Sequence, residues 1–147
     1  MRSILLFPGS FDPFTIGHKD IVDRALASFA DEVIIAIGVH QQKKCMFTAD
    51  ERIAQIKRIF ASEPRVKVCS YDGLTTDLAQ EMGVTALLRS VRSVKDYEYE
   101  CELADINRQL TGIETIILIA QPQYAAISSS TVRELIHYGK DVSTFLP

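Results

Sequence analysis

Apolar and polar positions alternate along the chain in blocks, and the blocks recur in one order. Runs rich in Ile, Val and Leu are each followed by a stretch in which apolar residues return every three or four positions. A continuous β-branched run indicates a strand that is buried on both faces, whereas the wider spacing indicates a helix with one buried face. The strands are expected at residues 4–7, 32–39, 65–70, 84–88 and 115–120.

The intervening segments also carry the signals that start and end helices. Thr48 and Glu51 form a capping box ahead of one helix, and Gly83 follows the last periodic residue of another. The helices are expected at residues 21–29, 49–61, 74–82, 94–110 and 131–138. Alternating strands and helices with short connections predict an α/β fold, a single Rossmann-like doubly wound domain over residues 1–147 with a parallel sheet of about five strands.

The connection between the first strand and the first helix is rich in glycine and polar side chains. Gly9 and Gly17 are expected to let the backbone approach a ligand, Ser10 adds a hydroxyl group, and His18 adds a titratable donor at the start of the helix. Unsatisfied N–H groups at a helix N-terminus carry partial positive charge and favour phosphate. The stretch therefore predicts a phosphate site, and the alternative is a structural turn with His18 merely in the first helical turn.

Polar side chains also follow the other strands, and in a doubly wound sheet the ligand crevice lies beyond the carboxyl ends. Lys43 follows the second strand, Arg89 and Arg92 the fourth, and the loop 124–130 the fifth. These pieces are expected to meet at one edge of the sheet. None is an obvious nucleophile with a partnered base, so the set favours nucleotidyl or phosphoryl transfer through positioning and charge stabilisation.

Each piece also has a simpler interpretation when it is considered alone. Lys43 could be a solvated loop residue, the two arginines could pair with Asp96 or Glu98, and the serine run 128–130 could be only a helix cap. The acidic side chains of the 94–110 helix read as a solvated face rather than as a metal cage. Each of these simpler interpretations is plausible alone. It is much less probable that all of them are correct at once, at every strand end.

The composition limits which partners and which cellular compartment can be expected for the protein. Sixteen basic and nineteen acidic residues give a net charge of −3, so no general attraction to nucleic acid is expected. No run reaches the roughly 18 apolar residues of a membrane span, and the first residues lack the features of a signal peptide. The three cysteines show neither CxxC nor His-paired metal spacing. We therefore expect a cytoplasmic protein with free thiols, no membrane partner and no dedicated metal site.

Several of these motifs, taken in order, resemble those of the bacterial phosphopantetheine adenylyltransferases. The histidine motif alone marks the wider nucleotidyltransferase superfamily, and the lysine, arginine and tyrosine–glutamate segments point to this member. The resemblance extends from the first strand to the last residues. The motifs that carry it are Gly-Ser-Phe-Asp-Pro at 9–13, Thr-Ile-Gly-His at 15–18, Lys43 with Met-Phe-Thr at 46–48, Arg89, Arg92, Tyr-Glu-Tyr-Glu at 97–100, Asn-Arg at 107–108 and Ile-Ser-Ser-Ser at 127–130.

The resemblance implies transfer of AMP from ATP to 4′-phosphopantetheine by direct in-line attack without a covalent intermediate, which gives dephospho-coenzyme A and pyrophosphate. It implies a catalytic set of His18, Lys43 and Arg92, with His18 stabilising the transition state. Four residues would contact the phosphopantetheine substrate: Ser10, Lys43, Thr75 and Arg89. The residues that would hold ATP are Ser10, Phe11, His18, Ser90, Val91, Arg92, Glu100, Tyr124, Ala125, Ala126, Ile127, Ser128, Ser129 and Ser130.

The resemblance further implies Mg²⁺ carried with ATP and assembly as a homohexamer. Ser90 stands where the family usually has glycine, and Ser10 stands where it often has threonine. Two other functions remain open at this point. One is a related transferase that acts on nicotinamide mononucleotide or makes a CDP-alcohol, and the other is a nucleotide-sensing module without turnover.

Overall fold

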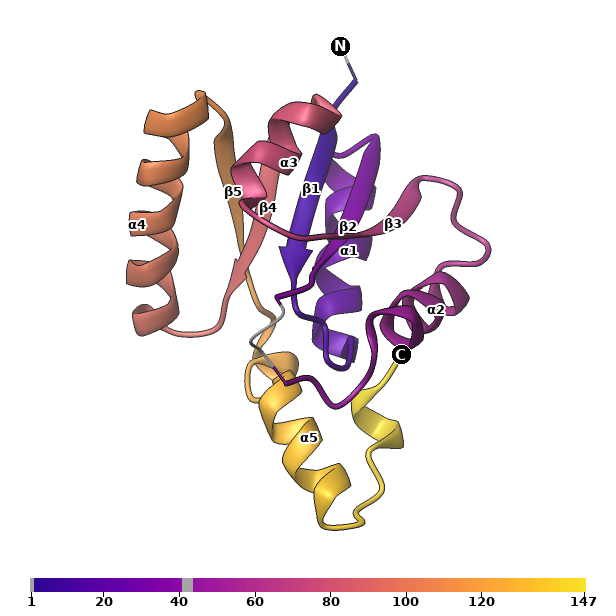
Figure 1. Ribbon diagram of the computed structural model, residues 1–147. Coiled ribbons are helices and arrows are strands. Elements are labelled where there is room, and N and C mark those ends of the chain that lie inside the picture. Colours follow the sequence, from indigo (N-terminus) through magenta and orange to yellow (C-terminus); the bar gives the residue numbers. More distant parts are fainter. Residues whose placement is uncertain (1, 41–43) are drawn as a thin grey trace.

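The computed structural model describes residues 2–40 and 44–147 (Figure 1). Strands and helices alternate along the chain, as the sequence pattern predicts. The strands are β1 (Ile4–Gly9), β2 (Glu32–Gly38), β3 (Val66–Tyr71), β4 (Ala86–Val91) and β5 (Glu114–Ile119). The helices are α1 (Ile16–Ser28), α2 (Ala49–Ile59), α3 (Thr75–Met82), α4 (Val94–Thr111) and α5 (Ser129–His137), with short 3₁₀ turns η1 (Pro122–Tyr124) and η2 (Ser143–Phe145).

The five strands form one parallel sheet in the order β3-β2-β1-β4-β5, with β1 at its centre. The chain winds outward from β1 to β3 and then crosses back to β4 and β5, so the winding direction reverses between β1 and β4. A reversal of this kind opens a crevice beyond the carboxyl ends of the two strands. The predicted α/β, doubly wound, Rossmann-like class is therefore confirmed.

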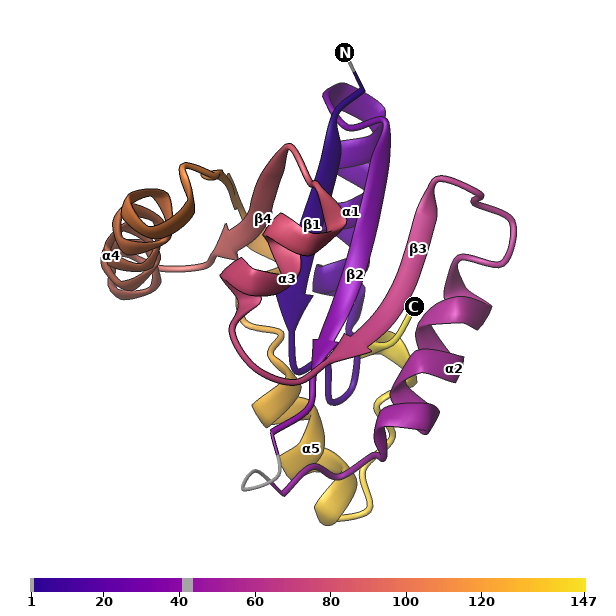
Figure 2. The same ribbon diagram turned by 45° about the horizontal axis from the view of Figure 1, so that its top comes forward.

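Helices cover both faces of the sheet, and the buried side chains form two clusters. The larger cluster lies between the sheet and helices α1 and α2, where Ile21 and Ile56 pack against Leu5 and Ile35. The smaller cluster lies on the opposite face, where Ala79 of α3 joins Leu6. Figure 2 shows α3 and α1 on opposite sides of the central strands, with α5 beyond their carboxyl ends. Helix α5 therefore lies at the end of the molecule where the crevice opens.

Several predicted boundaries are wrong, and the larger errors lie near the crevice. The first helix was expected at 21–29 but begins at Ile16, because Thr15 caps it ahead of the first apolar repeat. Strand β4 was expected at 84–88 but runs from Ala86 to Val91, because Val84 closes the end of α3 through its bond to the Ala79 carbonyl. The strand then continues through Arg89 and Ser90, which pair with β5 instead of following the strand. The last helix starts two residues earlier than expected, at Ser129, because the Ser128 side chain caps it by accepting the Thr131 N–H.

Candidate active site

Three adjoining cavities lie along the carboxyl ends of the strands. The first, called here the serine pocket, measures about 380 Å³ and lies between the start of α1, the start of α4 and the serine run of α5. The second, the α3–α4 groove, measures about 670 Å³ and runs along the sheet between these two helices. A central pocket of about 270 Å³ shares His18 and Ser90 with the serine pocket, and Ser10 and Arg89 with the groove. The three cavities therefore form a continuous site.

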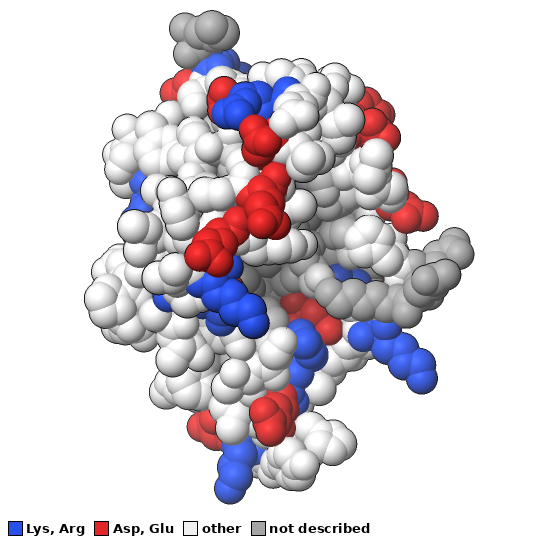
Figure 3. All heavy atoms as spheres, turned by 90° about the vertical axis from the view of Figure 1, so that its left-hand side faces the viewer, with Lys and Arg blue, Asp and Glu red and all other residues white. Residues whose placement is uncertain are grey.

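Figure 3 shows the face of the molecule that carries α4, with a hollow in its lower half. Lys and Arg side chains gather around this hollow together with acidic side chains at its lower edge, and further Asp and Glu side chains form a band above it. Although the net charge of the chain is negative, several basic side chains therefore lie at the hollow, where an anionic ligand could contact them.

Most of the predicted site residues are brought together here. The serine pocket is lined by His18, Ser90, Arg92, Glu100, Tyr124, Ile127, Ser128, Ser129 and Ser130. Ser10, Thr75 and Arg89 line the groove, and Phe11 lines the central pocket with Ser10 and His18. Three predicted residues line none of the three cavities: Val91, Ala125 and Ala126. Val91 is buried at the end of β4. Lys43 lies outside the described residues.

His18 is fixed by the first turn of α1 in one protonation state. The Thr15 N–H donates to Nδ1 of the imidazole at 2.9 Å, and the Thr15 hydroxyl accepts the His18 N–H, which completes a capping box. A ring nitrogen that accepts a bond from an N–H group cannot carry the proton, so the neutral ring is protonated on Nε2. Burial among aromatic rings, and then the charge of Arg92, lower the pKa of His18 from 6.5 to about 4. At neutral pH the ring is an uncharged Nε2–H donor.

Aromatic side chains from the glycine-rich loop make the environment of His18 apolar. The rings of Phe11 and Phe14 have their centroids 5.0 and 5.2 Å from the imidazole. Phe11 adopts a positive φ of 48°, and a Cβ atom on Gly9 would come within 2.8 Å of its ring. The missing side chain of Gly9 thus makes room for Phe11, and Gly9 also lines the central pocket and the groove, where it was expected to let the backbone approach a ligand. Gly17 lines the serine pocket itself.

Arg89 lies at the junction of the central pocket and the groove, held by a carboxylate of α4. Its Nε and Nη2 donate to the two oxygens of Glu100 at 2.8 and 2.6 Å, and its Nη1 donates to the Pro8 carbonyl at 3.0 Å. Burial opposes the charged form, but the hydrogen bonds and charge of Glu100 outweigh it and raise the pKa of Arg89. A guanidinium has five N–H groups, so one on each terminal nitrogen is left for a ligand oxygen.

The second arginine has a different partner and more freedom. Arg92 follows β4, its Nε lies 3.4 Å from a carboxylate oxygen of Asp96, and its side chain is 42% exposed. Of the two acidic residues considered from the sequence, Asp96 is therefore the partner of Arg92, and Arg89 pairs with Glu100 instead. An exposed ion pair of this kind contributes little to stability, so Arg92 can turn to a phosphate at small cost.

The serine run both caps α5 and ties it to the glycine-rich loop. The Ser128 hydroxyl accepts the Thr131 N–H at 3.1 Å, and the Ser129 hydroxyl donates to the Pro13 carbonyl at 2.8 Å. The capping role considered from the sequence is thus correct for Ser128. The backbone N–H groups of the first turn have no partner within the helix, and their partial positive charge faces the serine pocket.

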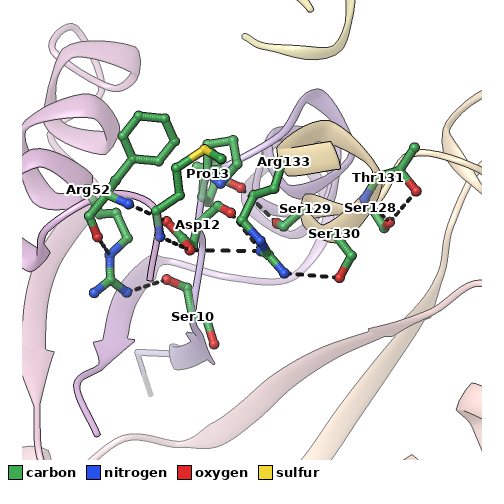
Figure 4. A network of polar contacts seen from close by, with 12 residues as sticks. Ser10, Asp12, Pro13, Arg52, Ser128, Ser129, Ser130, Thr131 and Arg133 are labelled. Atoms are coloured by element: carbon green, nitrogen blue, oxygen red, sulfur yellow. Dashed lines mark hydrogen bonds and ion pairs between the residues drawn. The ribbon is translucent and has the colours of Figure 1, made fainter. Parts of the chain in front are cut away.

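A partly buried polar network that the sequence reasoning missed joins the glycine-rich loop, residues 46–47, α2 and α5 beneath the site (Figure 4). The two carboxylate oxygens of Asp12 accept the N–H groups of Met46 and Phe47, both at 2.9 Å. Arg52 of α2, only 4% exposed, donates to the Ser10 carbonyl at 2.7 Å. Arg133 of α5 donates to the Asp12 carbonyl at 2.8 Å. Residues 46 and 47, which follow Lys43 in the sequence, are thereby anchored to the glycine-rich loop.

Some sequence signal for this network existed. Arg52 lies four residues before the buried Ile56, so it falls on the buried face of α2, where a charge needs partners. Its partners, however, are backbone carbonyls 42 residues away or in the loop ahead of the helix. Spacing along the chain does not reveal such contacts.

Comparison with known proteins places the chain among nucleotidyltransferases. A family model described as cytidylyltransferase-like matches residues 6–135. A phosphopantetheine adenylyltransferase of Porphyromonas gingivalis is 56% identical over 99% of the chain and 95% of the relative. Relatives with the same name from Phocaeicola vulgatus and Thermobifida fusca are 52% and 45% identical, over 97% and 100% of the chain and 93% and 88% of the relatives.

A solved structure shares the fold at low sequence identity. It comes from Vibrio parahaemolyticus and is described as a nicotinate-nucleotide adenylyltransferase. It superposes with a TM-score of 0.69 at 16% identity, covering 99% of the chain and 94% of the neighbour. Over residues 2–40 and 44–147, no helix is long and apolar enough to cross a membrane. Within the same residues, no group of three or more His, Cys, Asp or Glu side chains could hold a metal ion.

Proposed function

Since the chain belongs to the cytidylyltransferase-like family and its relatives are named phosphopantetheine adenylyltransferases, we propose that it transfers AMP from ATP to 4′-phosphopantetheine. The products are dephospho-coenzyme A and pyrophosphate, a step of coenzyme A biosynthesis. A phosphate oxygen of the acceptor attacks the α-phosphorus of ATP in line. The P–O bond to pyrophosphate breaks as the new P–O bond forms, and no covalent intermediate with the protein is involved.

The observation that carries this proposal is the neutral His18 ring in the central pocket, between two cavities of different character. Its Nε2–H is the remaining donor of the ring, because Nδ1 is occupied by the Thr15 N–H. Negative charge grows on the α-phosphate oxygens during the transfer, and a fixed donor stabilises that charge without reorganisation. His18 with Arg92, and Lys43 by resemblance, form the proposed catalytic set.

The two outer cavities suit the two substrates. We assign ATP to the serine pocket, where Arg92, the Ser90 position and the α5 N-terminus favour a triphosphate. The acceptor is assigned to the α3–α4 groove, because Arg89 offers two N–H groups where the groove meets the central pocket, and the rest of the groove lining includes the apolar side chains of Leu103 and Ile106. A phosphate on a long, partly apolar arm matches that arrangement.

Magnesium is proposed to arrive with the triphosphate rather than to occupy a site of its own. Mg²⁺ binds such sites through one or two carboxylates together with substrate phosphates and water. Asp96 lines the serine pocket and is the carboxylate there that is not committed to a buried ion pair. The ion would neutralise charge on the phosphates, while the residues described above bind and orient them.

Assembly as a homohexamer and a cytoplasmic location complete the proposal. Large apolar side chains that line none of the three cavities are exposed on α4 and on the edge strand β5, including Val94 (75%), Tyr97 (53%) and Ile119 (72%). Apolar side chains gathered on one side of a molecule support burial against other copies. The resemblance supplies the number of copies.

The test is pyrophosphate release from Mg-ATP with 4′-phosphopantetheine or nicotinamide mononucleotide as acceptor, with product identification by mass spectrometry. We expect dephospho-coenzyme A from the first acceptor and no product from the second. Equal turnover of both would favour a related transferase with another acceptor. ATP binding without release of pyrophosphate under either condition would favour a nucleotide-sensing module.

A further inference from the structure

The loop at residues 120–127, which follows β5 and is called here the pocket wall, forms one side of the serine pocket and is fastened at both of its ends. At its start, the Ala120 N–H donates to the Val91 carbonyl at 2.9 Å and so extends the pairing of β4 with β5. Just beyond its end, the Ser129 hydroxyl is bonded to the Pro13 carbonyl. The residues of the wall that line the pocket are Ala120, Tyr124 and Ile127.

Between these two ends, Gln121 joins the pocket wall to helix α1. Its side-chain Nε2 donates to Oδ1 of Asp20 at 2.8 Å. In the part of the chain that the structure describes, the other hydrogen bonds of residues 121–127 run inside the segment, such as the bond from the Tyr124 N–H to the Gln121 carbonyl at 2.9 Å. Asp20 therefore holds the middle of the wall from the side of α1.

Asp20 is itself held in place by a second partner. Arg24, one turn further along α1, donates through Nη1 to Oδ2 of Asp20 at 3.2 Å and to the Ile119 carbonyl at 3.0 Å. The Asp20 side chain is only 15% exposed, and both of its oxygens are used. Hydrogen bonds to an ionised group are stronger than those between neutral groups, so this carboxylate is a firm support for Gln121.

The pocket wall supplies an apolar part of the pocket lining. Tyr124 lies close to α1, since a Cβ atom on Gly17 would come within 3.6 Å of the Tyr124 Cβ. Ile21, the residue after Asp20, lines the same pocket. A nucleobase has flat, apolar faces and suits this part of the lining, whereas a triphosphate suits Arg92 and the N-terminus of α5.

Resting on the proposed function, we propose that Asp20 is a positioning residue for ATP, which acts through Gln121 to hold the pocket wall against the nucleobase. Asp20 lines none of the three cavities, so it acts without touching the ligand. A wall that moves away for part of the time lowers the apparent affinity by the fraction of molecules that remain competent to bind. The triphosphate end is held separately, because Ser129 and Arg133 fasten α5 to the glycine-rich loop.

The test is Asp20→Ala, which removes the acceptor of the Gln121 side chain. We expect KM for ATP to rise roughly three- to thirtyfold, the effect of one lost hydrogen bond, with kcat and KM for 4′-phosphopantetheine unchanged. Inorganic tripolyphosphate, used as a competitor of ATP, should inhibit the variant and the parent with the same inhibition constant, because it has no base to place against the wall. General destabilisation of the protein would not separate these two ligands of one pocket.

Asp23→Ala is the matched control, since Asp23 is an exposed acid on the same helix that pairs with Lys19 rather than with the pocket wall. It should leave KM for ATP near the parent value. The double variant Asp20→Asn with Gln121→Glu exchanges donor and acceptor while it keeps the net charge. It should restore KM for ATP, because an asparagine at position 20 can donate to the new carboxylate and still accept from Arg24.

Three results would overturn the inference about Asp20: an unchanged KM for ATP in Asp20→Ala, an equal weakening of tripolyphosphate inhibition, or no recovery in the double variant. An equal rise of KM for ATP in Asp23→Ala would also overturn it, because the effect would then be one of charge on α1. A parent protein that neither binds ATP nor releases pyrophosphate from it would instead overturn the proposed function, so the two failures are distinguishable.

Discussion

At the scale of single residues, His18 combines a fixed tautomer with a lowered pKa. For the reaction, the loss of its Nε2–H should appear in kcat, because the donor is needed most when charge develops on the α-phosphate. We expect His18→Asn to reduce kcat by roughly 10²- to 10³-fold with KM for ATP little changed. Steady-state kinetics with a melting curve for the variant measure this. A near-normal kcat with a raised KM for ATP would make His18 a binding residue only.

The same lowered pKa couples His18 to stability. The unfolded chain takes up a proton near pH 6.5, whereas the folded ring takes it up only near pH 4. Between these values the unfolded state binds more protons, so stability falls as the pH falls from 6.5 to 4, by up to about 3 kcal/mol. Urea unfolding of the free protein across this range should show the loss. His18→Asn should show a shallower pH dependence, and identical slopes would contradict the assignment.

Arg89 illustrates a charge that is held in place before any ligand arrives. Arg89→Ala should raise KM for 4′-phosphopantetheine by roughly 10- to 100-fold, the range for a hydrogen bond to a charged group, and change KM for ATP much less. The substitution also leaves the carboxylate of Glu100, which is 8% exposed, without its partner. Arg89→Ala with Glu100→Gln is therefore the control, and it should recover stability but not acceptor affinity. A larger change in KM for ATP would show that the two substrates have been assigned to the wrong cavities.

At the scale of elements, the network beneath the site makes α2 a support for a loop to which it is not adjacent in sequence. Arg52→Met would remove a guanidinium that bonds the Ser10, Phe47 and Thr48 carbonyls. We expect the free energy of unfolding to fall by about 2–4 kcal/mol, because a charged side chain that is 4% exposed loses all three of these hydrogen bonds. Arg58→Met, at an exposed position on the same helix, should change it by less than about 0.5 kcal/mol. Equal stability of the two variants in urea unfolding would contradict this role.

Periodicity was sufficient to predict the elements, and the parallel arrangement was sufficient to predict that separate loops meet at one edge. It was not sufficient at β4, because Arg89 and Ser90 have the polarity of a loop but lie in a strand that borders a cavity. The Asp12–Arg52 network and the Arg89–Glu100 pair depend on which segments meet in space, and spacing in the chain carries no such information. The role of Gly9 was also hidden, since it depends on where the Phe11 ring lies.

At the scale of the whole molecule, the exposed apolar side chains of α4 predict self-association. Val94 lies at the start of α4, is 75% exposed and lines none of the three cavities. We expect Val94→Glu to shift the protein toward smaller species in sedimentation experiments, because a charge would have to be buried at a contact. Lys95→Glu, which also adds negative charge at this place, is the control for general repulsion. If Val94→Glu leaves the distribution of oligomeric species unchanged, or if the parent protein is already monomeric, Val94 does not lie at a contact between copies.

The parallel sheet also gives the molecule two ends with different tolerances. Every strand delivers its carboxyl end to the site, so every helix-to-strand connection returns at the opposite end, for example between α2 and β3 at residues 60–65. Labels, tags or peptide insertions at such a turn would be separated from the chemistry by the whole length of the sheet. Because all strands run in one direction, these turns offer an attachment point for immobilising or tracking the protein at the end of the sheet opposite the candidate active site.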